Sequence, residues 1–376
     1  MTSGTPGTHG TPGTPGTPGT PDLREPRAGG GANGRGTAEP EEDATKDVED
    51  VLRWYRSFAE HEAPGNSPQY GVLATGVAGD PELIGRLAAM PRLKRQPNLL
   101  FGAVRFLGGP IDTWPAFREW TLARWDRVAA VMIERRTQTN EVGRCATLLP
   151  ALATLPQPLA LIEVGASAGL CLQPDRYRYR YRDARGELPP IGPAESPVVL
   201  DCRLSGPVPV PEEPPAIAWR AGVDLNPLNP ADPDDARWLR CLVWPGERQR
   251  PRAERLDAAL RLAAADPPPV LRGDLNETVA ELIDRAPLGT TPVVLHSAVL
   301  MYLDRAGRDA FARTVLDSPA HWLCNESPGV YPEHAEGLPP APKDTAGEVR
   351  SHFVLALDGR PIAWTAPHGQ FAHWLG

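Results

Sequence analysis

One carboxylate, two glycines and a small hydroxyl residue form the clearest chemical pattern in this sequence. The pattern consists of Glu163, Gly165, Ser167 and Gly169, spaced two residues apart. It ends the apolar run 158–164, which shows no alternation and therefore predicts a parallel strand covered on both faces. Glycines allow a tight turn and a close approach to a ligand, and we expect a helix from about Ala168. The stretch predicts a strand that presents a turn and one acid to a ligand.

Two known nucleotide-binding sequence patterns fit this stretch poorly. The dinucleotide fingerprint requires Gly-x-Gly-x-x-Gly, and the phosphate loop requires Gly-Lys followed by Ser or Thr. Neither string occurs between residues 158 and 170. A tight strand-to-helix turn in any doubly wound α/β protein remains an alternative interpretation of the spacing.

Further polar side chains occur where predicted parallel strands end. Apolar stretches predict strands at 217–226, 270–275 and 321–326, and a fourth within 291–303 whose apolar run ends at His296. The last residues of these runs include Asp224, Asp274, His296, Asn325 and Glu326. The carboxyl ends of parallel strands meet at one edge of a sheet, where open α/β sheets bind ligands. We therefore expect these side chains to lie near Glu163.

His296 is the candidate general base, because an imidazole accepts a proton near neutral pH and a carboxylate orients it. Asn325 and Glu326 are its expected neighbours in the site, and Ser297 or Tyr302 are substitutes. Simpler interpretations stay open: His296 as a satisfied structural residue, Asp224 as part of a turn, and Asp274 as a helix N-cap.

A polar break at 137–141 precedes the glycine turn. One interpretation is a loop with an Asn or Thr cap. In the other, Asn140 reaches over the ligand, and Arg144, one turn into the next helix, meets a carboxylate. We keep Asn140 and Arg144 as candidate ligand contacts.

Composition limits the class of protein. The chain has 376 residues, a formal charge of −8 and five cysteines without a C-x-x-C pair. The acidic balance argues against nucleic acid and anionic membranes as partners, and favours a small-molecule or protein substrate. The cysteine pattern suggests neither a disulfide framework nor a metal site. Without a membrane-length apolar run or a signal peptide pattern, we expect a cytoplasmic protein.

The chain divides into three predicted parts. Residues 1–46 hold Gly-Thr-Pro-like triplets and are expected to be a disordered tail, with a short collagen-like trimer as the alternative. Residues 47–155 show helical periodicity and predict an all-helical cap subdomain, and residues 156–376 predict an α/β domain. Strict Tyr/Arg alternation predicts a hairpin insertion at about 175–205, with nucleic-acid binding as the less favoured interpretation.

The first motif, Glu163-x-Gly165-x-Ser167-x-Gly169, resembles that of class I S-adenosylmethionine-dependent methyltransferases, with Ser167 where glycine is common. The stretches VDLNP, RGDL, VVLHSAVLMYL and HWLCNE and the Asp358-Gly359 hairpin resemble bacterial domain-of-unknown-function family 2332 over most of residues 48–376. The methyltransferase resemblance implies a Rossmann-like sheet of seven strands in the order 3-2-1-4-5-7-6.

The same resemblance implies roles for the acids. Asp224 would bind the ribose hydroxyls, and Asp274 would face the adenine amino group. Glu163 and Asp224 lie 61 residues apart, against about 20 in such units, and the Tyr/Arg insertion accounts for the excess. The implied cofactor is S-adenosylmethionine and the implied activity is methyl transfer to a small molecule or protein side chain. A non-catalytic binding or scaffold protein and an α/β enzyme using another nucleotide remain alternatives.

Overall fold

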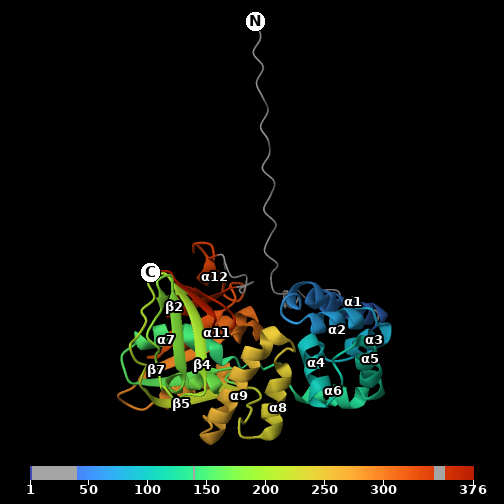
Figure 1. Ribbon diagram of the computed structural model, residues 1–376, viewed down its shortest axis with the longest axis horizontal. Helices are drawn as coiled ribbons and strands as arrows, with labels where there is room; N and C mark the ends of the chain where they lie inside the picture. The colour runs from blue at the N-terminus through green and yellow to red at the C-terminus, as the bar shows by residue number, and fades with distance from the viewer. Residues whose placement is uncertain (2–39, 139, 343–351) are drawn as a thin grey trace, which may run out of the picture.

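The computed structural model describes residues 1, 40–138, 140–342 and 352–376, and the side chains of the first helix from residue 45 (Figure 1). Most of the predicted tail lies outside these residues. The first helix begins at Pro40, so the expected tail boundary at residue 46 falls inside this helix.

The described elements between residues 40 and 153 are all helical. They are α1 (Pro40–Ser57), η1 (Phe58–Glu62), α2 (Pro68–Ala78), α3 (Pro81–Ala88), η2 (Arg92–Lys94), α4 (Pro97–Phe106), α5 (Trp114–Ala123), α6 (Trp125–Glu134), η3 (Val142–Arg144) and α7 (Cys145–Ala153). Proline occupies the first turn of α2, α3 and α4, where its missing N–H costs nothing. The apolar faces of α1 to α4 share one core with Trp238 and with the helices α8 (Pro233–Leu242) and α9 (Arg250–Ala265).

The remaining helical elements flank the sheet and its connections. They are η4 (Leu170–Leu172), η5 (Pro174–Arg176), η6 (Glu247–Gln249), α10 (Leu275–Asp284), η7 (Leu300–Tyr302), α11 (Arg305–Leu316) and α12 (Pro332–Ala335). Figure 1 shows α8 and α9 between the sheet and the blue and teal helices α1 to α6.

A single mixed sheet of 11 strands confirms the α/β class. The strands are β1 (Leu159–Val164), β2 (Arg178–Asp183), β3 (Gly186–Glu187), β4 (Val199–Ser205), β5 (Ile217–Asp224), β6 (Val270–Arg272), β7 (Thr291–Ser297), β8 (His321–Glu326), β9 (Phe353–Leu357), β10 (Arg360–Thr365) and β11 (Phe371–Trp374). Their order is β3-β2-β4-β11-β10-β9-β8-β7-β1-β5-β6. The strand β1 is buried along its whole length, as its continuous apolar run predicts.

The predicted seven-stranded order is wrong. The parallel strands β6-β5-β1-β7-β8 follow the 3-2-1-4-5 part of that order, but β9 pairs antiparallel with β8, and β10 follows outside it. The Asp358-Gly359 turn, with φ of 50° and 76°, makes β9 and β10 direct neighbours. The last strand β11 then pairs with β4, which extends the sheet instead of leaving an open edge.

The Tyr/Arg insertion is not the predicted two-stranded hairpin. The strand β2 pairs in parallel with β4, and only the two-residue β3 pairs antiparallel with β2. The tyrosine face is buried as its alternation predicts, and Tyr181 donates its hydroxyl hydrogen bond to the Ala146 carbonyl at 2.8 Å. This bond ties the tyrosine face to α7, and the pairing of β4 with β11 joins the insertion to the main sheet.

The two faces of the sheet have separate cores. On one face, Leu159, Leu161, Leu295 and Leu323 pack with α7. On the other face, Ile162, Val164, Val294 and Trp322 pack with α10 and α11. Successive residues of one strand therefore point into different cores. Whether a side chain packs with α7, or with α10 and α11, depends on which face of the sheet its position in the strand gives it.

Candidate functional site

Polar residues gather on the α7 face at the carboxyl edge of the sheet. Glu163 pairs in register with Leu295 and Gly222, so it shares the face of Leu295 and, two residues beyond Gly222, that of Asp224. Ser297, two residues after Leu295, follows on the same face. This carboxyl edge, with the segment 138–144 that precedes α7, is the candidate site.

The turn after β1 has the left-handed backbone that its glycines suggested. Gly165 and Gly169 have φ of 69° and 67°, and Ser167 lies between them with φ of 53°. The predicted helix from Ala168 is absent, since only the short 3-10 helix η4 follows and Pro174 begins η5. The alternating strand β2 starts soon afterwards, which leaves no room for a helix.

Backbone strain is concentrated at this edge. Of the three described non-glycine residues with positive φ, Ser167 and Ala298 belong to the site, and Asp358 belongs to the distant hairpin turn. The two loops touch, because a Cβ on Gly165 would lie 2.5 Å from Val299 Cγ2. Left-handed non-glycine residues persist where the surrounding structure fixes them, and they cluster at ligand-binding sites.

Asn140 clamps the turn. Its Nδ2 donates to the Ala166 carbonyl at 2.8 Å, and its Oδ1 accepts from the Leu170 N–H at 3.0 Å. The predicted site residue Asn140 therefore lies at the turn, but both ends of its amide are engaged by the protein. Its role is to hold the turn in shape.

Asp224 ties the end of β5 to the same turn. Its Oδ2 accepts from the Ser167 N–H at 2.9 Å, and its Oδ1 accepts from the Asn226 N–H at 2.7 Å and from Gln138 Nε2 at 3.0 Å. The structure therefore brings Asp224 and Ser167 together. The Ser167 hydroxyl is buried without a hydrogen-bond partner among the described residues.

Glu163 is a buried acid without a partner. Its residue is 6% exposed, and its Oε2 has no hydrogen-bond partner within the described parts of the chain. Burial raises the pKa of Glu163 well above its usual range, Cys171 and Asp224 raise it further, and Arg144 opposes the increase. Burial therefore favours the neutral carboxylic acid form of this side chain over the carboxylate.

Arg144 is a buried cation near this acid. Its residue is 7% exposed, and its guanidinium donates to the carbonyls of Pro367 and Ser297 at 2.9 and 2.7 Å. No carboxylate of the described residues forms an ion pair with it. A buried guanidinium held only by neutral carbonyls keeps an uncompensated charge, which an incoming anion would neutralise.

Glu141 anchors the segment that carries these residues, and sequence reasoning missed it. It lies 2.7 Å from Arg252 Nε and 3.0 Å from Arg255 Nη2, and its Oε1 accepts from the Gly143 N–H. Burial alone would raise the pKa of Glu141, but Arg255 and Arg252 lower it to about 2. The spacing of two arginines on one face of α9 was the available signal for a buried acid.

His296 lies on the opposite face from Glu163, so its predicted place in the crevice is wrong. The residue is 0% exposed; its Nδ1 lies 2.8 Å from Glu326 Oε1, and its Nε2 accepts from Trp322 Nε1 at 2.9 Å. The ring packs edge-on against Phe311 of α11. With both ring nitrogens engaged, His296 cannot take a proton from a ligand without breaking these bonds.

The other predicted site residues also have structural partners. Asn325 donates to Ser297 Oγ at 2.9 Å and accepts from Thr365 Oγ1 at 2.7 Å, which satisfies both ends of its amide. Asp274 is the N-cap of α10 and accepts from the Asn276 N–H. Its capping role accounts for its position at the end of β6.

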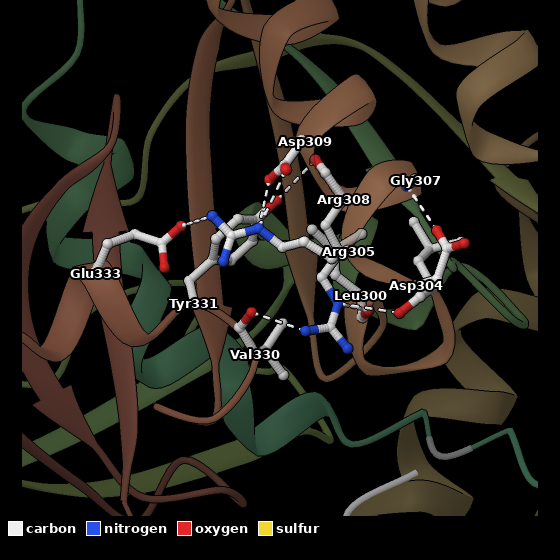
Figure 2. Close-up of polar contacts among 10 residues, drawn as sticks. Leu300, Asp304, Arg305, Gly307, Arg308, Asp309, Val330, Tyr331 and Glu333 are labelled. Carbon is white, nitrogen blue, oxygen red and sulfur yellow. Dashed lines mark hydrogen bonds and ion pairs between the residues drawn. The ribbon is translucent and has the colours of Figure 1, made fainter. Parts of the chain in front are cut away.

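Hydrogen bonds from two charged side chains hold the loop that follows β7. Glu326 Oε1 accepts from the N–H groups of Val299 and Leu300. Figure 2 shows the Arg308 guanidinium, which donates to the carbonyls of Leu300 and Val330. The same guanidinium also donates to the Leu303 carbonyl. These contacts fix the loop that packs against Gly165. The exposed Tyr302 belongs to this loop and adds an aromatic ring beside the site.

Across the described ranges, no cluster of three His, Cys, Asp or Glu side chains is arranged to hold a metal ion. No helix in the same ranges is both long and apolar enough to cross a membrane.

The chain matches the model of a known protein family. The model of the family described as "Uncharacterized protein conserved in bacteria (DUF2332)" matches residues 53–374. Neither the curated proteins nor the solved structures contain a match to the chain.

Proposed function

The chain belongs to this bacterial family, DUF2332, and we propose that it binds S-adenosylmethionine at the carboxyl edge of β1 and transfers its methyl group to a small molecule or a protein side chain. The observation that carries the proposal is the buried, unpartnered Oε2 of Glu163 beside the left-handed turn. A buried polar atom without a partner is costly, and a ligand donor relieves that cost.

The charges of the site match this ligand. The amino-acid part of the ligand carries an ammonium group and a carboxylate. The ammonium suits Glu163, and the carboxylate suits Arg144, which has no carboxylate partner among the described residues. Asp224 is the candidate ribose contact, because Oδ2 takes one backbone hydrogen bond and a carboxylate oxygen accepts two. Gly165 and Gly169 let the turn pack closely against Val299 and Pro268, which a Cβ at either position would meet at 2.5 Å.

The turn is less suited to a phosphate. The N–H groups of Gly165 and Ala166 both donate to the Val223 carbonyl, and those of Ser167 and Leu170 donate to Asp224 and Asn140. A phosphate site requires free backbone N–H groups, usually at the start of a helix, and no helix of useful length follows this turn. These observations weigh against the alternative of an α/β enzyme using another nucleotide.

When bound, S-adenosylmethionine would supply an electrophilic methyl group, so the protein's main task is to position an acceptor in line with it. The braced loop 298–303 and the turn at Gly165 form the rigid walls that such positioning requires. Glu163 and Arg144 would hold the ligand's amino-acid part, and Asp224 its ribose.

A non-catalytic binding protein is the second candidate, and one observation favours it. His296 and Asn325, the sequence-based choices for catalysis, have all their side-chain polar groups engaged. Methyl transfer would therefore rest on positioning alone or on a base brought by the acceptor.

Equilibrium binding tests the ligand. We expect S-adenosylmethionine and S-adenosylhomocysteine to bind the purified full-length chain in calorimetry, and NAD and ATP to bind far more weakly. Asp224→Asn should weaken binding by roughly 10- to 150-fold, the range for a charged hydrogen bond. Glu281→Gln is the matched control, because it removes one carboxylate that is 67% exposed on α10. Binding of NAD or ATP without S-adenosylmethionine would contradict the proposal.

A second assay separates enzyme from binder. The chain is incubated with S-adenosylmethionine labelled on its methyl carbon and with cell extract divided into small-molecule and protein fractions. Labelled product together with S-adenosylhomocysteine supports the methyltransferase, and the fraction identifies the acceptor class. Tight binding without turnover in either fraction supports the non-catalytic candidate.

A further inference from the structure

We propose that Arg252, Arg255 and His368 bind a carboxylate group of the methyl acceptor, so that the acceptor is a small carboxylic acid. The binding site itself stands on the geometry of these residues. Its assignment to the acceptor rests on the proposed function and deepens it, because it names the class of substrate that the protein methylates. None of the three residues belongs to the cofactor contacts proposed above.

The first support is an excess of positive charge. Arg252 and Arg255 both contact Glu141, at 2.7 and 3.0 Å, and no other carboxylate of the described residues forms an ion pair with either guanidinium. Two cations therefore share one anion, which leaves one positive charge without a counterpart. The first turn of α9, which carries Arg252, contains no acidic residue, and the positive end of the helix dipole adds to the excess.

The second support is hydrogen-bonding capacity that the protein leaves unused. A guanidinium has five N–H donors in a planar fork that matches a carboxylate. Arg255 Nη2 donates to Glu141, but Arg255 Nε is buried without a hydrogen-bond partner in the described parts of the chain. The side chains of Arg252 and Arg255 are 15% and 23% exposed, so they are largely desolvated and still open to a ligand. Unpaired donors in such a place favour an anion.

His368 adds a neutral donor beside the two arginines. Its Nδ1 lies 3.9 Å from Glu141 Oε2 and is buried without a hydrogen bond to any described residue, while 42% of its side chain is exposed. Burial and the neighbouring Arg252 lower the pKa of His368, which favours the neutral ring. A neutral imidazole donates one N–H without adding charge. The excess therefore stays at one positive charge, which a singly charged carboxylate neutralises.

Close backbone packing holds His368 in this place. A Cβ on Gly143 would overlap the His368 carbonyl oxygen, and a Cβ on Gly369 would overlap the Gly143 carbonyl. Gly369 also has φ of 80°, a left-handed backbone that favours glycine. The loop between β10 and β11 therefore lies directly against η3. Three segments that are distant in the sequence, η3, α9 and this loop, form one rigid site.

The position of this site beside the proposed cofactor assigns it to the acceptor. Arg144 Nε donates to the carbonyl of Pro367, the residue before His368, at 2.9 Å. Arg144 would hold the carboxylate of S-adenosylmethionine, and a short carbon chain joins that carboxylate to the sulfur that bears the methyl group. A cavity whose lining includes Gln138 and Arg252 adjoins both the candidate site and the arginines. An acceptor held by its carboxylate therefore lies beside the methyl donor.

Carboxylate binding to the unmodified protein, without any cofactor, tests the site itself. Acetate is the probe, because it is small enough for any carboxylate site, and acetamide is its uncharged match. Inorganic phosphate tests the other common oxyanion. In ligand-observed NMR at constant ionic strength, we expect acetate to bind at least about tenfold more tightly than acetamide or phosphate. Equal binding of acetate and acetamide, or tighter binding of phosphate, would overturn the proposal.

Variants on α9 assign the binding to its residues. Arg255→Gln should weaken acetate binding by at least roughly tenfold, the lower end of the range for a charged hydrogen bond. Arg255→Lys keeps the charge without the fork, so it should recover part of the affinity. Arg261→Gln is the matched control, because Arg261 is exposed on the same helix. Circular dichroism checks the fold of each variant. A folded Arg255→Gln protein that binds acetate as well as the Arg261→Gln control contradicts the assignment.

The labelled-methyl assay tests the role of the site in the reaction. The small-molecule part of the extract is first divided on an anion-exchange resin. We expect labelled product from the retained, acidic fraction alone, and less of it when acetate is added as a competitor. Label that appears only with the unretained fraction or with proteins would overturn the acceptor role. If acetate binds but S-adenosylmethionine does not, the proposed function fails and the acceptor role with it, while the carboxylate site stands.

Discussion

Replacing Glu141 by glutamine tests the electrostatic anchor of the site segment. The carboxylate contacts Arg252 at 2.7 Å and Arg255 at 3.0 Å, and its side chain is 2% exposed. The substitution keeps the shape of the side chain and removes its charge. Two guanidinium groups would then lose their only carboxylate partner among the described residues.

The magnitude follows from the pKa of Glu141. Its usual value is 4.5, and Arg255 and Arg252 hold it at about 2 in the folded protein despite its burial. At about 1.4 kcal/mol per pKa unit, the charged form contributes about 3 kcal/mol to the free energy of unfolding at neutral pH. Removing one partner of a buried ion pair typically costs about 3–5 kcal/mol, which is consistent with this value.

The sign of the pH dependence is fixed by the lowered pKa. The contribution is fully present above pH 4.5 and is lost as the pH falls toward 2, the value in the folded state. Urea unfolding at a series of pH values should therefore show a Glu141→Gln deficit of about 3 kcal/mol at neutral pH that shrinks in acid.

The matched control for this prediction is Glu254→Gln on α9. Glu254 is 66% exposed and lies 3.7 Å from Arg250, so its loss should cost under about 1 kcal/mol. A Glu141→Gln protein as stable as this control at neutral pH would refute the reasoning. So would a deficit that grows as the pH falls.

Gly165→Ala should abolish ligand binding, because its Cβ would lie 2.5 Å from a Val299 methyl; Gly289→Ala has a similar positive φ and open space, so its calorimetric affinity should remain that of the wild type. His296→Ala should lower the free energy of unfolding, measured in urea, by about 2–4 kcal/mol, because it leaves a cavity and removes hydrogen bonds. A variant that keeps the wild-type stability but loses turnover would instead show that His296 acts as a base. Glu163→Gln should gain stability relative to the wild type as pH rises above 4.5, since the raised pKa makes the wild-type acid lose stability through that range; melting temperatures that run parallel across pH would contradict this.

Local pattern was sufficient for several features of the fold. The apolar run before Glu163 predicted a buried parallel strand, and β1 is buried throughout. The Asp358-Gly359 pair predicted the hairpin of β9 and β10, and Tyr/Arg alternation predicted a strand with one buried face. Each of these depends on residues adjacent in sequence, whose side-chain period or backbone freedom sets the local structure.

The pairing of strands that lie far apart in the sequence could not be predicted from local pattern. Nothing in the sequence of β4 indicates that it pairs with β11, 166 or more residues later, nor that β9 lies beside β8. Pairing depends on which edges remain open once the other strands are in place. For the same reason, the predicted seven-strand order was wrong beyond β8.

The candidate site shows the same division at the level of single residues. The sequence by itself determined that Glu163 and His296 each lie at the end of a strand, because length and hydrophobicity define where a strand stops. It did not determine their faces, because both faces are apolar and alternation is therefore not visible. Only the tertiary structure, through the register of Glu163 with Leu295, placed Glu163 near Arg144 and enclosed His296 between Glu326 and Trp322 on the far side. A shift of one residue along a strand moves each side chain to the opposite face of the sheet. Packing against α7 on one face and α11 on the other decides which of the two positions the strand adopts.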